Sequence, residues 1–183
     1  VDLTKRRGYE STLNKKIKFI MNFEIIDDFL PKSEFKNIQS VMMGTYFPWY
    51  WNEWAVKPGD NKSQLTHTFH SVGSPWNGRV SEFYELFYNV QRKLRVKKLY
   101  RIKANLNYKT FFHRKAGYHI DTPGTKTAIL YINTNNGGTK FKNGKIVRSV
   151  ENRLVLFDLD LQHAGVTCTD QKRRVVVNLN YLS

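Results

Sequence analysis

The histidines and carboxylates in the second half of the chain could bind a metal ion. His119-Ile120-Asp121 places an imidazole and a carboxylate two residues apart, and in extended backbone such residues point to the same side. Two neutral imidazoles and one carboxylate, with other positions left open, form the ligand set of non-haem iron(II) oxygen chemistry. His163 is the best candidate for the second imidazole because it begins a later predicted strand. We therefore expect His119, Asp121 and His163 to form a metal site.

An arginine and two amides lie on one face of the last predicted strand. In residues 173–182, RRVVVNLNYL, strand alternation places Arg174, Val176, Asn178 and Asn180 on the same side. A strand that faces an apolar core should not carry these polar groups inward. A guanidinium binds a carboxylate through paired, charge-assisted hydrogen bonds. The strand therefore favours a concave site for a small anion such as a 2-oxo acid.

Two further predicted strands carry polar residues that share a face. Asn105 and Asn107 are two apart in ANLNY, and Thr127 and Tyr131 are four apart in TAILYIN. Both spacings keep the side chains of a strand on one side. These residues are therefore candidate neutral donors for the same ligand site.

The first half of the chain predicts two helices among short extended segments. Phe35, Ile38 and Met42 recur at helical spacing within residues 32–43, after Pro31. A second helix is expected over 79–95. Extended structure is expected within 23–30, 45–54 and 64–72.

The second half predicts many short strands, and these define the fold class. They cover 99–108, 127–133, 138–141, 145–147, 153–158, 163–168 and 173–182. Asn143-Gly144 between two of them is a strong hairpin signal. Helices followed by many strands favour a mainly β fold with flanking helices. The double-stranded β-helix, or cupin-like jelly roll, is the expected architecture.

Length and composition limit the domain count and the compartment. The chain has 183 residues, enough for one hydrophobic core, and we expect a single domain over 21–183. Residues 1–20 are polar and basic, and they are expected to be an upstream or vector-derived extension or a flexible basic arm. The single cysteine, Cys168, excludes an internal disulfide and fits a reducing cytoplasm. No apolar run is long enough to span a membrane.

The charge of the chain is strongly positive. Thirty Lys and Arg residues against fifteen Asp and Glu give a net charge of +15. Ten basic residues and no acidic one lie between Leu86 and Ile120. This stretch is either a patch for an acidic or nucleic-acid partner or a solvated basic face at a helix end.

For two other groups of residues, a structural role is the favoured interpretation. The aromatic cluster at 46–54 could line a substrate entrance, but a hydrophobic wall packed against the sheets is the favoured interpretation. His67 and His70 lie three apart in a β-rich segment, where they should point to opposite sides, so they are not expected to be metal ligands.

The sequence resembles the 2-oxoglutarate/Fe(II)-dependent dioxygenases of the prolyl 4-hydroxylase-like type, especially small phage-encoded hydroxylases. The motif is H-x-D, a distal histidine and an arginine about ten residues later. It stands here as His119-Ile120-Asp121, His163 and Arg174. Three surrounding segments also resemble sequences of this family: KTAILYINTNNGGTKF, NRLVLFDLDLQHAG and RRVVVNLNYL. The resemblance covers about 99–182, with weaker likeness in IIDDFLP, FPWYWN and QLTHTFH.

The resemblance implies roles for individual residues. The H-x-D pair and the distal histidine would be the Fe(II) ligands. Arg174 would bind the distal carboxylate of 2-oxoglutarate, with the Tyr131 hydroxyl donating to the same carboxylate. Asn105 would contact the carboxylate nearer the metal. Arg173 is the alternative to Arg174, although alternation points it to the opposite side, and Thr127 is a candidate supporting donor.

The resemblance also implies an activity. Fe(II), 2-oxoglutarate and O2 would serve hydroxylation of a C–H bond, with release of succinate and CO2. A peptidyl or free prolyl substrate is favoured. The alternatives are a nucleic-acid-directed oxygenase of the same class, a nucleic-acid-binding module with this fold, and a non-enzymatic, cupin-like metal-binding protein. A phage-encoded protein would act in the cytoplasm of its host cell.

Overall fold

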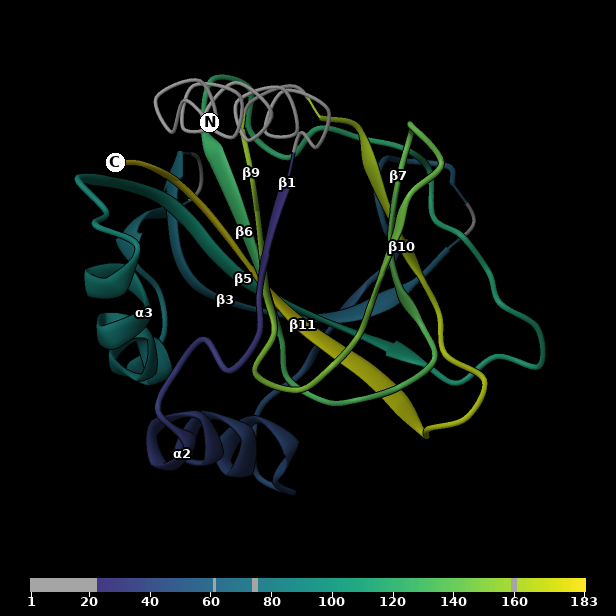
Figure 1. The fold of residues 1–183 in the computed structure, drawn as a ribbon, viewed down its shortest axis with the longest axis horizontal. Coiled ribbons are helices and arrows are strands. Elements are labelled where there is room, and N and C mark those ends of the chain that lie inside the picture. Colours follow the sequence, from purple (N-terminus) through teal and green to yellow (C-terminus); the bar gives the residue numbers. More distant parts are fainter. Residues whose placement is uncertain (1–22, 61, 74–75, 159–160) are drawn as a thin grey trace, which may run out of the picture.

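Two antiparallel β-sheets face each other, and helices cover the outer side of the larger one (Figure 1). The computed structural model describes residues 23–60, 62–73, 76–158 and 161–183. The extension expected at residues 1–20 lies outside these ranges. The paired sheets confirm the predicted double-stranded β-helix, with β-strands as the main element.

The larger sheet follows the order β1-β9-β6-β11-β5-β3-β2, and β4 pairs with β3. The bounds of its strands are β1 Phe23–Ile26, β2 Tyr50–Asn52, β3 Gln64–Gly73, β4 Trp76–Arg79, β5 Lys98–Tyr108, β6 Lys126–Tyr131, β9 Leu154–Phe157 and β11 Arg173–Leu182. The smaller sheet has the order β10-β7-β8, with β7 Gly138–Phe141, β8 Ile146–Arg148 and β10 His163–Val166. The hairpin predicted at Asn143-Gly144 joins β7 to β8, and Gly144 has the positive φ of 90° that such a turn requires.

The first predicted helix is confirmed. Helix α2 spans Lys32–Met43 and buries Phe35, Ile38 and Met42, as their spacing predicts. Within the described residues, no helix is long and apolar enough to cross a membrane.

The second predicted helix is wrong in extent. Only its first expected residue, Arg79, belongs to β4, which pairs with β3, and its helical part consists of a 3₁₀-helix η1 (Glu82–Phe87) and a short helix α3 (Tyr88–Lys93). The Ser81 hydroxyl accepts a hydrogen bond from the Phe83 amide and so begins η1 after the strand. The helical spacing of Phe83 and Phe87 therefore predicts a helical segment correctly, but not its 3₁₀ geometry or its shorter extent.

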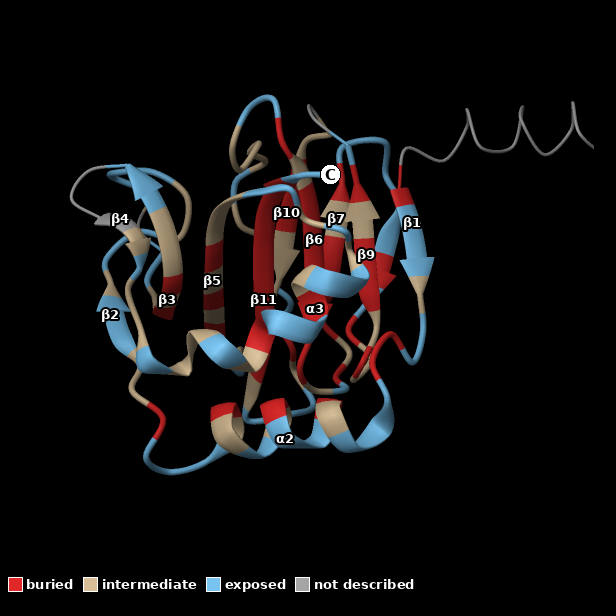
Figure 2. Cartoon of the chain, turned by 90° about the vertical axis from the view of Figure 1, so that its left-hand side faces the viewer, coloured by how far each residue is buried: buried red, intermediate tan, exposed pale blue. Residues whose placement is uncertain are grey.

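Strand alternation separates an outer core from an inner pocket. Ile102, Ala104 and Leu106 of β5 are buried in the cluster that includes Phe35 of α2 and Val90 of α3. Figure 2 shows buried segments on the strands and on the side of α2 that faces them. The alternate residues of β5 and β11 face the space between the two sheets. This arrangement places the polar face predicted for β11 on the inside.

Candidate active site

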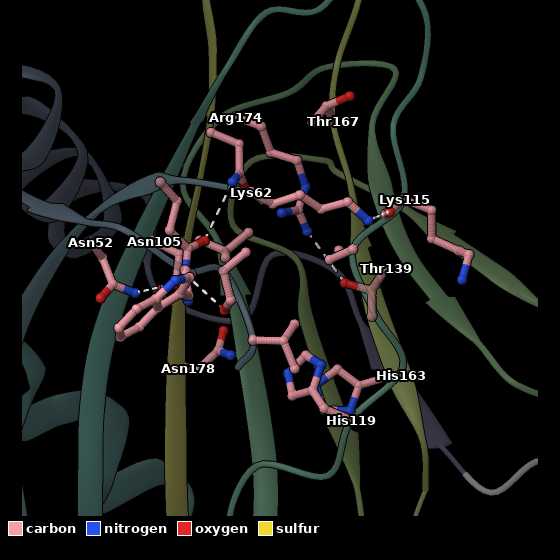
Figure 3. A pocket seen from close by; sticks show the side chains of 18 of the residues that line it. Asn52, Lys62, Asn105, Lys115, His119, Thr139, His163, Thr167, Arg174 and Asn178 are labelled. Atoms are coloured by element: carbon pink, nitrogen blue, oxygen red, sulfur yellow. Dashed lines mark hydrogen bonds between the residues drawn. The ribbon is translucent and has the colours of Figure 1, made fainter. Parts of the chain in front are cut away.

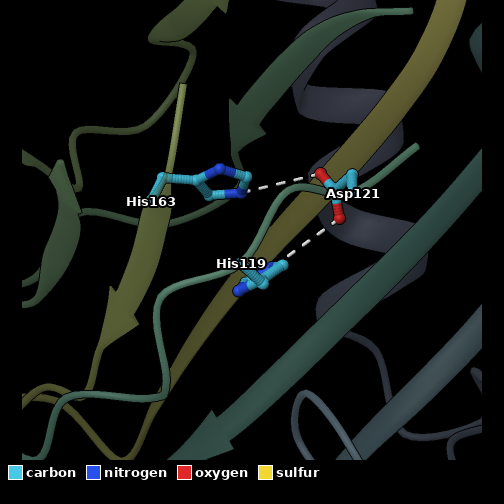
Figure 4. A group of neighbouring side chains, drawn as sticks. All are labelled: His119, Asp121 and His163. Carbon is cyan, nitrogen blue, oxygen red and sulfur yellow. Dashed lines mark ion pairs between the residues drawn. The ribbon is translucent and has the colours of Figure 1, made fainter. Parts of the chain in front are cut away.

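The structure brings the three predicted metal ligands together (Figure 4). His163 begins β10, and His119 forms an isolated bridge with it through two backbone hydrogen bonds of 3.0 and 3.1 Å. Asp121 follows two residues later, in a segment that is irregular rather than a continuous strand. One ligand atom from each of the three side chains lies within 4.8 Å of the others.

Backbone hydrogen bonds fix the tautomers of both histidines. Nδ1 of His119 lies 3.1 Å from the Gly117 carbonyl oxygen, and Nδ1 of His163 lies 3.2 Å from the Leu161 carbonyl oxygen. A carbonyl oxygen can only accept, so each Nδ1 donates its proton and each Nε2 keeps a lone pair. Nε2 of both histidines therefore carries a lone pair on the side that faces Asp121. This is the form of imidazole that can bind a metal ion.

The Asp121 carboxylate has one oxygen held by the protein and one without a partner. Its Oδ1 accepts a hydrogen bond of 2.7 Å from Nη2 of Arg101. Its Oδ2 lies 3.6 Å from Nε2 of His163, and both atoms are buried without a hydrogen-bond partner among the described residues. Burial would raise the pKa of Asp121, but the charge of Arg101 is the main effect that outweighs it, so the pKa is lowered and the group stays anionic. This donor set fits a divalent cation such as Fe(II).

Arg174 is a buried cation without an anionic partner in the described part of the chain. Its side chain is 3% exposed, its Nε donates to the Ser149 hydroxyl at 3.1 Å, and its Nη2 donates to the Thr139 hydroxyl at 3.3 Å. Burial lowers the pKa of Arg174, but a guanidinium remains protonated. Because an uncompensated buried charge is costly, this residue is suited to bind an anion.

Two glycines lie beside the Arg174 side chain, and at Gly137 a larger residue would crowd it. A Cβ atom at Gly165 would lie 3.6 Å from its Nη1, and one at Gly137 would lie 3.0 Å from its Cδ. Gly165 is two residues from His163 on β10 and lines the same pocket. The anion site therefore adjoins the strand that carries a metal ligand.

The structure places Tyr131 behind the pocket surface. Its fully buried hydroxyl donates to the Thr139 hydroxyl at 2.7 Å, and its ring lies 5.7 Å from the Arg174 guanidinium carbon. Burial raises the pKa of Tyr131, so the hydroxyl keeps its proton. Thr139 lines the pocket and Tyr131 does not. Tyr131 therefore acts here by orienting Thr139, and its direct contact with a ligand remains a prediction.

The other predicted residues occupy distinct places. Asn105 lines the pocket, in register with Val176 of β11. The Thr127 hydroxyl accepts a hydrogen bond of 3.0 Å from the Asn180 amide, whose oxygen accepts one of 3.1 Å from Nε of Arg101. Arg173 points to the opposite face, as alternation predicts, and donates to the Met43 carbonyl oxygen at 2.7 Å. These contacts support Arg174 over Arg173 as the anion-binding residue.

Sequence reasoning missed three residues of the site. Arg101 is on the same face of β5 as Asn105, so strand alternation could have found it. Thr139 and Ser149 bind Arg174 from β7 and from the segment after β8. No local pattern signals these two, because their partner lies more than twenty residues away along the chain.

The triad and Arg174 open into one cavity of about 550 Å³ between the sheets (Figure 3). That volume is typical of a small-molecule site. In Figure 3, Arg174, Asn178, His119 and His163 all point into the cavity. The side-chain oxygen of Asn178 is buried there without a partner among the described residues. The cavity thus combines a metal site, a cationic anion site and free amides.

The remaining histidines and the aromatic segment lie outside the metal site. His67 is buried, with Nδ1 2.8 Å from the Pro48 carbonyl oxygen and Nε2 2.8 Å from the Ser81 hydroxyl. Neither His67 nor His70 lines the cavity. The expected hydrophobic wall at 46–54 is only partly correct, because Phe47 is buried but Trp51 is 67% exposed and Trp54 lines the cavity mouth.

Solved structures share this arrangement of sheets. A prolyl hydroxylase from Trichoplax adhaerens, in complex with a hypoxia-inducible-factor peptide fragment, has a TM-score of 0.64 and 16% identity, covering 100% of this chain and 94% of that chain. A 2OG-Fe(II) oxygenase family oxidoreductase from Burkholderia pseudomallei has a TM-score of 0.66 and 10% identity, covering 87% and 84%. A Pseudomonas putida prolyl-4-hydroxylase has a TM-score of 0.59 and 11% identity, covering 91% and 95%.

The fold is therefore the jelly roll seen in 2-oxoglutarate/Fe(II) oxygenases. Prolyl hydroxylases are among the similar structures, as the sequence resemblance predicts. At the level of sequence, no protein-family model and no curated protein matches the chain.

Proposed function

We propose that this protein is an Fe(II)- and 2-oxoglutarate-dependent oxygenase that hydroxylates a C–H bond. The observation that carries the proposal is one cavity holding both the His119-Asp121-His163 cluster, with two buried atoms that lack partners, and the buried Arg174, which has no anionic partner among the described residues. Each of these features is costly without a ligand, and a metal ion with a dicarboxylate would satisfy both. The fold of the similar oxygenases agrees with this assignment.

The protein's own groups would hold and orient the metal. His119 and His163 present Nε2, because Nδ1 of each donates to a backbone carbonyl. Asp121 presents Oδ2, because Oδ1 is held by Arg101. When bound, Fe(II) supplies a centre at which 2-oxoglutarate and O2 react, giving succinate, CO2 and one oxygen atom for the substrate C–H bond.

Arg174 would anchor the cosubstrate. Its guanidinium can pair with the distal carboxylate of 2-oxoglutarate through charge-assisted hydrogen bonds. The hydroxyls of Thr139 and Ser149 hold the guanidinium in place, and Tyr131 in turn holds Thr139. Asn105 and Asn178 offer amides on the cavity wall for the remaining polar atoms. The protein thereby supplies geometry and a shielded pocket.

The prolyl substrate expected from the resemblance has support from the similar structures, two of which are prolyl hydroxylases. Most of the described residues that line the cavity are polar or cationic, a composition that does not by itself single out a proline ring. The charge of the lining is therefore the better guide to the substrate class.

Anaerobic binding followed by oxygen tests the proposal. Fe(II) and 2-oxoglutarate are added without oxygen, a visible charge-transfer band is sought, and succinate is measured after oxygen is admitted. A band and slow succinate formation without substrate are expected. A folded protein that binds Fe(II) but gives no succinate would be the non-enzymatic, cupin-like binder. Absence of both binding and succinate would overturn the metal-site assignment as well.

A further inference from the structure

The lining of the cavity contains far more basic than acidic residues. Seven basic residues reach it: Lys57, Lys62, Arg101, Lys103, Arg114, Lys115 and Arg174. Asp121 is the single acid among the described residues of the lining, and it is held by Arg101 and by the metal site. Two positive groups have a local role, Arg101 at Asp121 and Arg174 at the cosubstrate. The other five remain as an excess of positive charge over the metal centre.

Four of the five form a basic rim at the mouth of the cavity. We call Lys57, Lys62, Arg114 and Lys115 the rim cations. All four are exposed, and none forms an ion pair within the described part of the chain. Lys103 lies deeper, on the inward face of β5, where burial lowers its pKa. A row of cations from the rim toward the metal favours an extended anion rather than a single carboxylate.

Contacts between two loops hold the rim in place. The loop before β3 is organised by Asp60, whose carboxylate accepts hydrogen bonds from the amides of Val56 and Lys62 at 2.8 and 3.1 Å. Nζ of Lys62 then donates to the carbonyl oxygen of Lys115 at 2.8 Å, across to the loop after β5 (Figure 3). The cations are thus presented together by two segments distant in sequence.

Exposed aromatic rings accompany the rim cations. Trp54 and Tyr108 line the cavity and are 38% and 60% exposed. Phe111 and Phe112 lie between the lining residues Thr110 and Arg114, and are 88% and 74% exposed. The Phe111 and Phe112 rings pack against each other edge-on, with centroids 4.7 Å apart, and form an exposed apolar patch of the kind found at interaction sites. Cations interleaved with aromatic faces are the arrangement that binds the phosphates and bases of single-stranded nucleic acid.

We propose that the substrate is a single-stranded nucleic acid, with its phosphates on the rim cations and its bases on the neighbouring aromatic rings. This inference rests on the proposed function, because it names the substrate of that site. One nucleotide would enter the cavity, where a C–H bond becomes C–OH as 2-oxoglutarate and O2 become succinate and CO2. A single strand is required because a base in a duplex cannot reach the bottom of a pocket without leaving its stack.

An acidic peptide would match the charge but not the aromatic rings. Carboxylates can pair with the rim cations, yet a peptide of acidic residues offers no flat faces for Tyr108 or Phe111. Bases provide such faces at every nucleotide, whatever the sequence. The two features together therefore favour nucleic acid, and the peptide becomes an outcome of the test.

Binding and turnover can be measured separately on the full chain. Fluorescence anisotropy gives the affinity for labelled single-stranded DNA, single-stranded RNA, the matching duplex and a glutamate-rich peptide, at several salt concentrations. Succinate formation with Fe(II), 2-oxoglutarate and O2 is then measured with and without each unlabelled probe. We expect a single strand to bind more tightly than the duplex or the peptide, and to stimulate succinate formation.

A charge-matched pair of variants locates the site. K57Q/K62Q/R114Q/K115Q removes the rim cations and should weaken single-strand binding by about tenfold or more, with a salt slope lower by about 3. K32Q/R92Q/K97Q/K142Q removes the same charge from exposed residues outside the cavity and should bind as the unchanged protein does. Tyr108→Ala should weaken binding about fivefold or more, whereas Tyr88→Ala on α3 should not. Thermal unfolding checks that each variant is folded.

The outcomes distinguish this inference from the proposed function. Succinate formation without substrate, combined with no binding of a single strand, overturns the inference and leaves the oxygenase standing. Strand binding with no succinate under any condition overturns both and indicates a binding module. Stimulation by the acidic peptide alone overturns nucleic acid in favour of a protein substrate. Equal losses in the two quadruple variants overturn the rim as the binding site.

Discussion

Arg101 Nη2 lies 2.7 Å from Asp121 Oδ1 and leaves Asp121 Oδ2 free toward His163. This pairing joins the inward face of β5 to the segment that carries two of the metal ligands. It also orients the carboxylate, so that Oδ2, which has no hydrogen-bond partner among the described residues, faces His163. Asn180 accepts a hydrogen bond from Arg101 and donates one to Thr127. Residues of three strands, β5, β11 and β6, therefore fix the orientation of the Asp121 carboxylate.

Replacing Arg101 should weaken metal binding without removing a ligand. Arg101→Met keeps an unbranched aliphatic stem but removes the guanidinium and frees Oδ1, and partners of this kind typically contribute about 10–100-fold to metal affinity. The measurement is Fe(II) affinity by anaerobic competition with a chelator. Arg101→Lys should recover part of the loss, and an affinity equal to that of the unchanged protein would show that Arg101 does not orient Asp121.

Asp121→Ala should have a larger effect, because it removes the only carboxylate of the cluster and leaves Arg101 without its anion. We expect Fe(II) affinity to fall by more than about 100-fold, beyond the range of supporting partners, and succinate formation to stop. Asp27→Ala is the matched control, since Asp27 also pairs with an arginine, Arg153, but at the surface. Iron binding and turnover retained in Asp121→Ala would exclude the triad.

Arg174→Ala should mainly weaken 2-oxoglutarate binding. Loss of a charged hydrogen-bonding group costs about 1.5–3 kcal/mol, or roughly 10–150-fold in affinity. Titration of the Fe(II)-loaded protein with 2-oxoglutarate under anaerobic conditions measures the change. Arg173→Ala, one residue away on the opposite face, should leave the affinity as it was. If the Arg174→Ala affinity is unchanged, Arg173 or a different cosubstrate must be considered.

His67 should make the protein less stable in acid. Burial lowers its pKa below the ordinary 6.5, despite the hydrogen bond to Pro48. The unfolded state therefore binds more protons below pH 6.5, and the free energy of unfolding falls as the pH drops through that value toward the folded pKa. Burial lowers the pKa of His70 and His163 in the same direction, so His67 is one of several contributors.

Denaturant unfolding at pH 7.5 and 5.5, without metal, measures this effect. In His67→Gln the loss of stability on acidification should be smaller by up to about 1.4 kcal/mol for each pH unit, the value for one proton. His113→Gln, which removes an exposed histidine, is the matched control. An unaltered pH dependence in His67→Gln would show that His67 is not the group that titrates.

Local patterns predicted most of the strands and which of their residues share a face. The alternation of β11 correctly placed Arg174 and Asn178 inside and Arg173 outside. Helical spacing predicted α2, but it overestimated the second helix, which begins only after β4 ends at Arg79 and is divided into η1 and α3. Propensity describes a segment alone, whereas a strand needs a partner that may be distant in the chain.

The sequence by itself determined which side chains carry the chemistry, because the period of two in a strand and the short spacing of His119 and Asp121 are local. The tertiary structure decided which of them meet. The bridge from His119 to His163, the pairing of Arg101 with Asp121 and the hydroxyls around Arg174 all join segments far apart in the chain. Such contacts depend on how the two sheets close over the cavity. The same closure turns basic residues scattered along the sequence into a single rim.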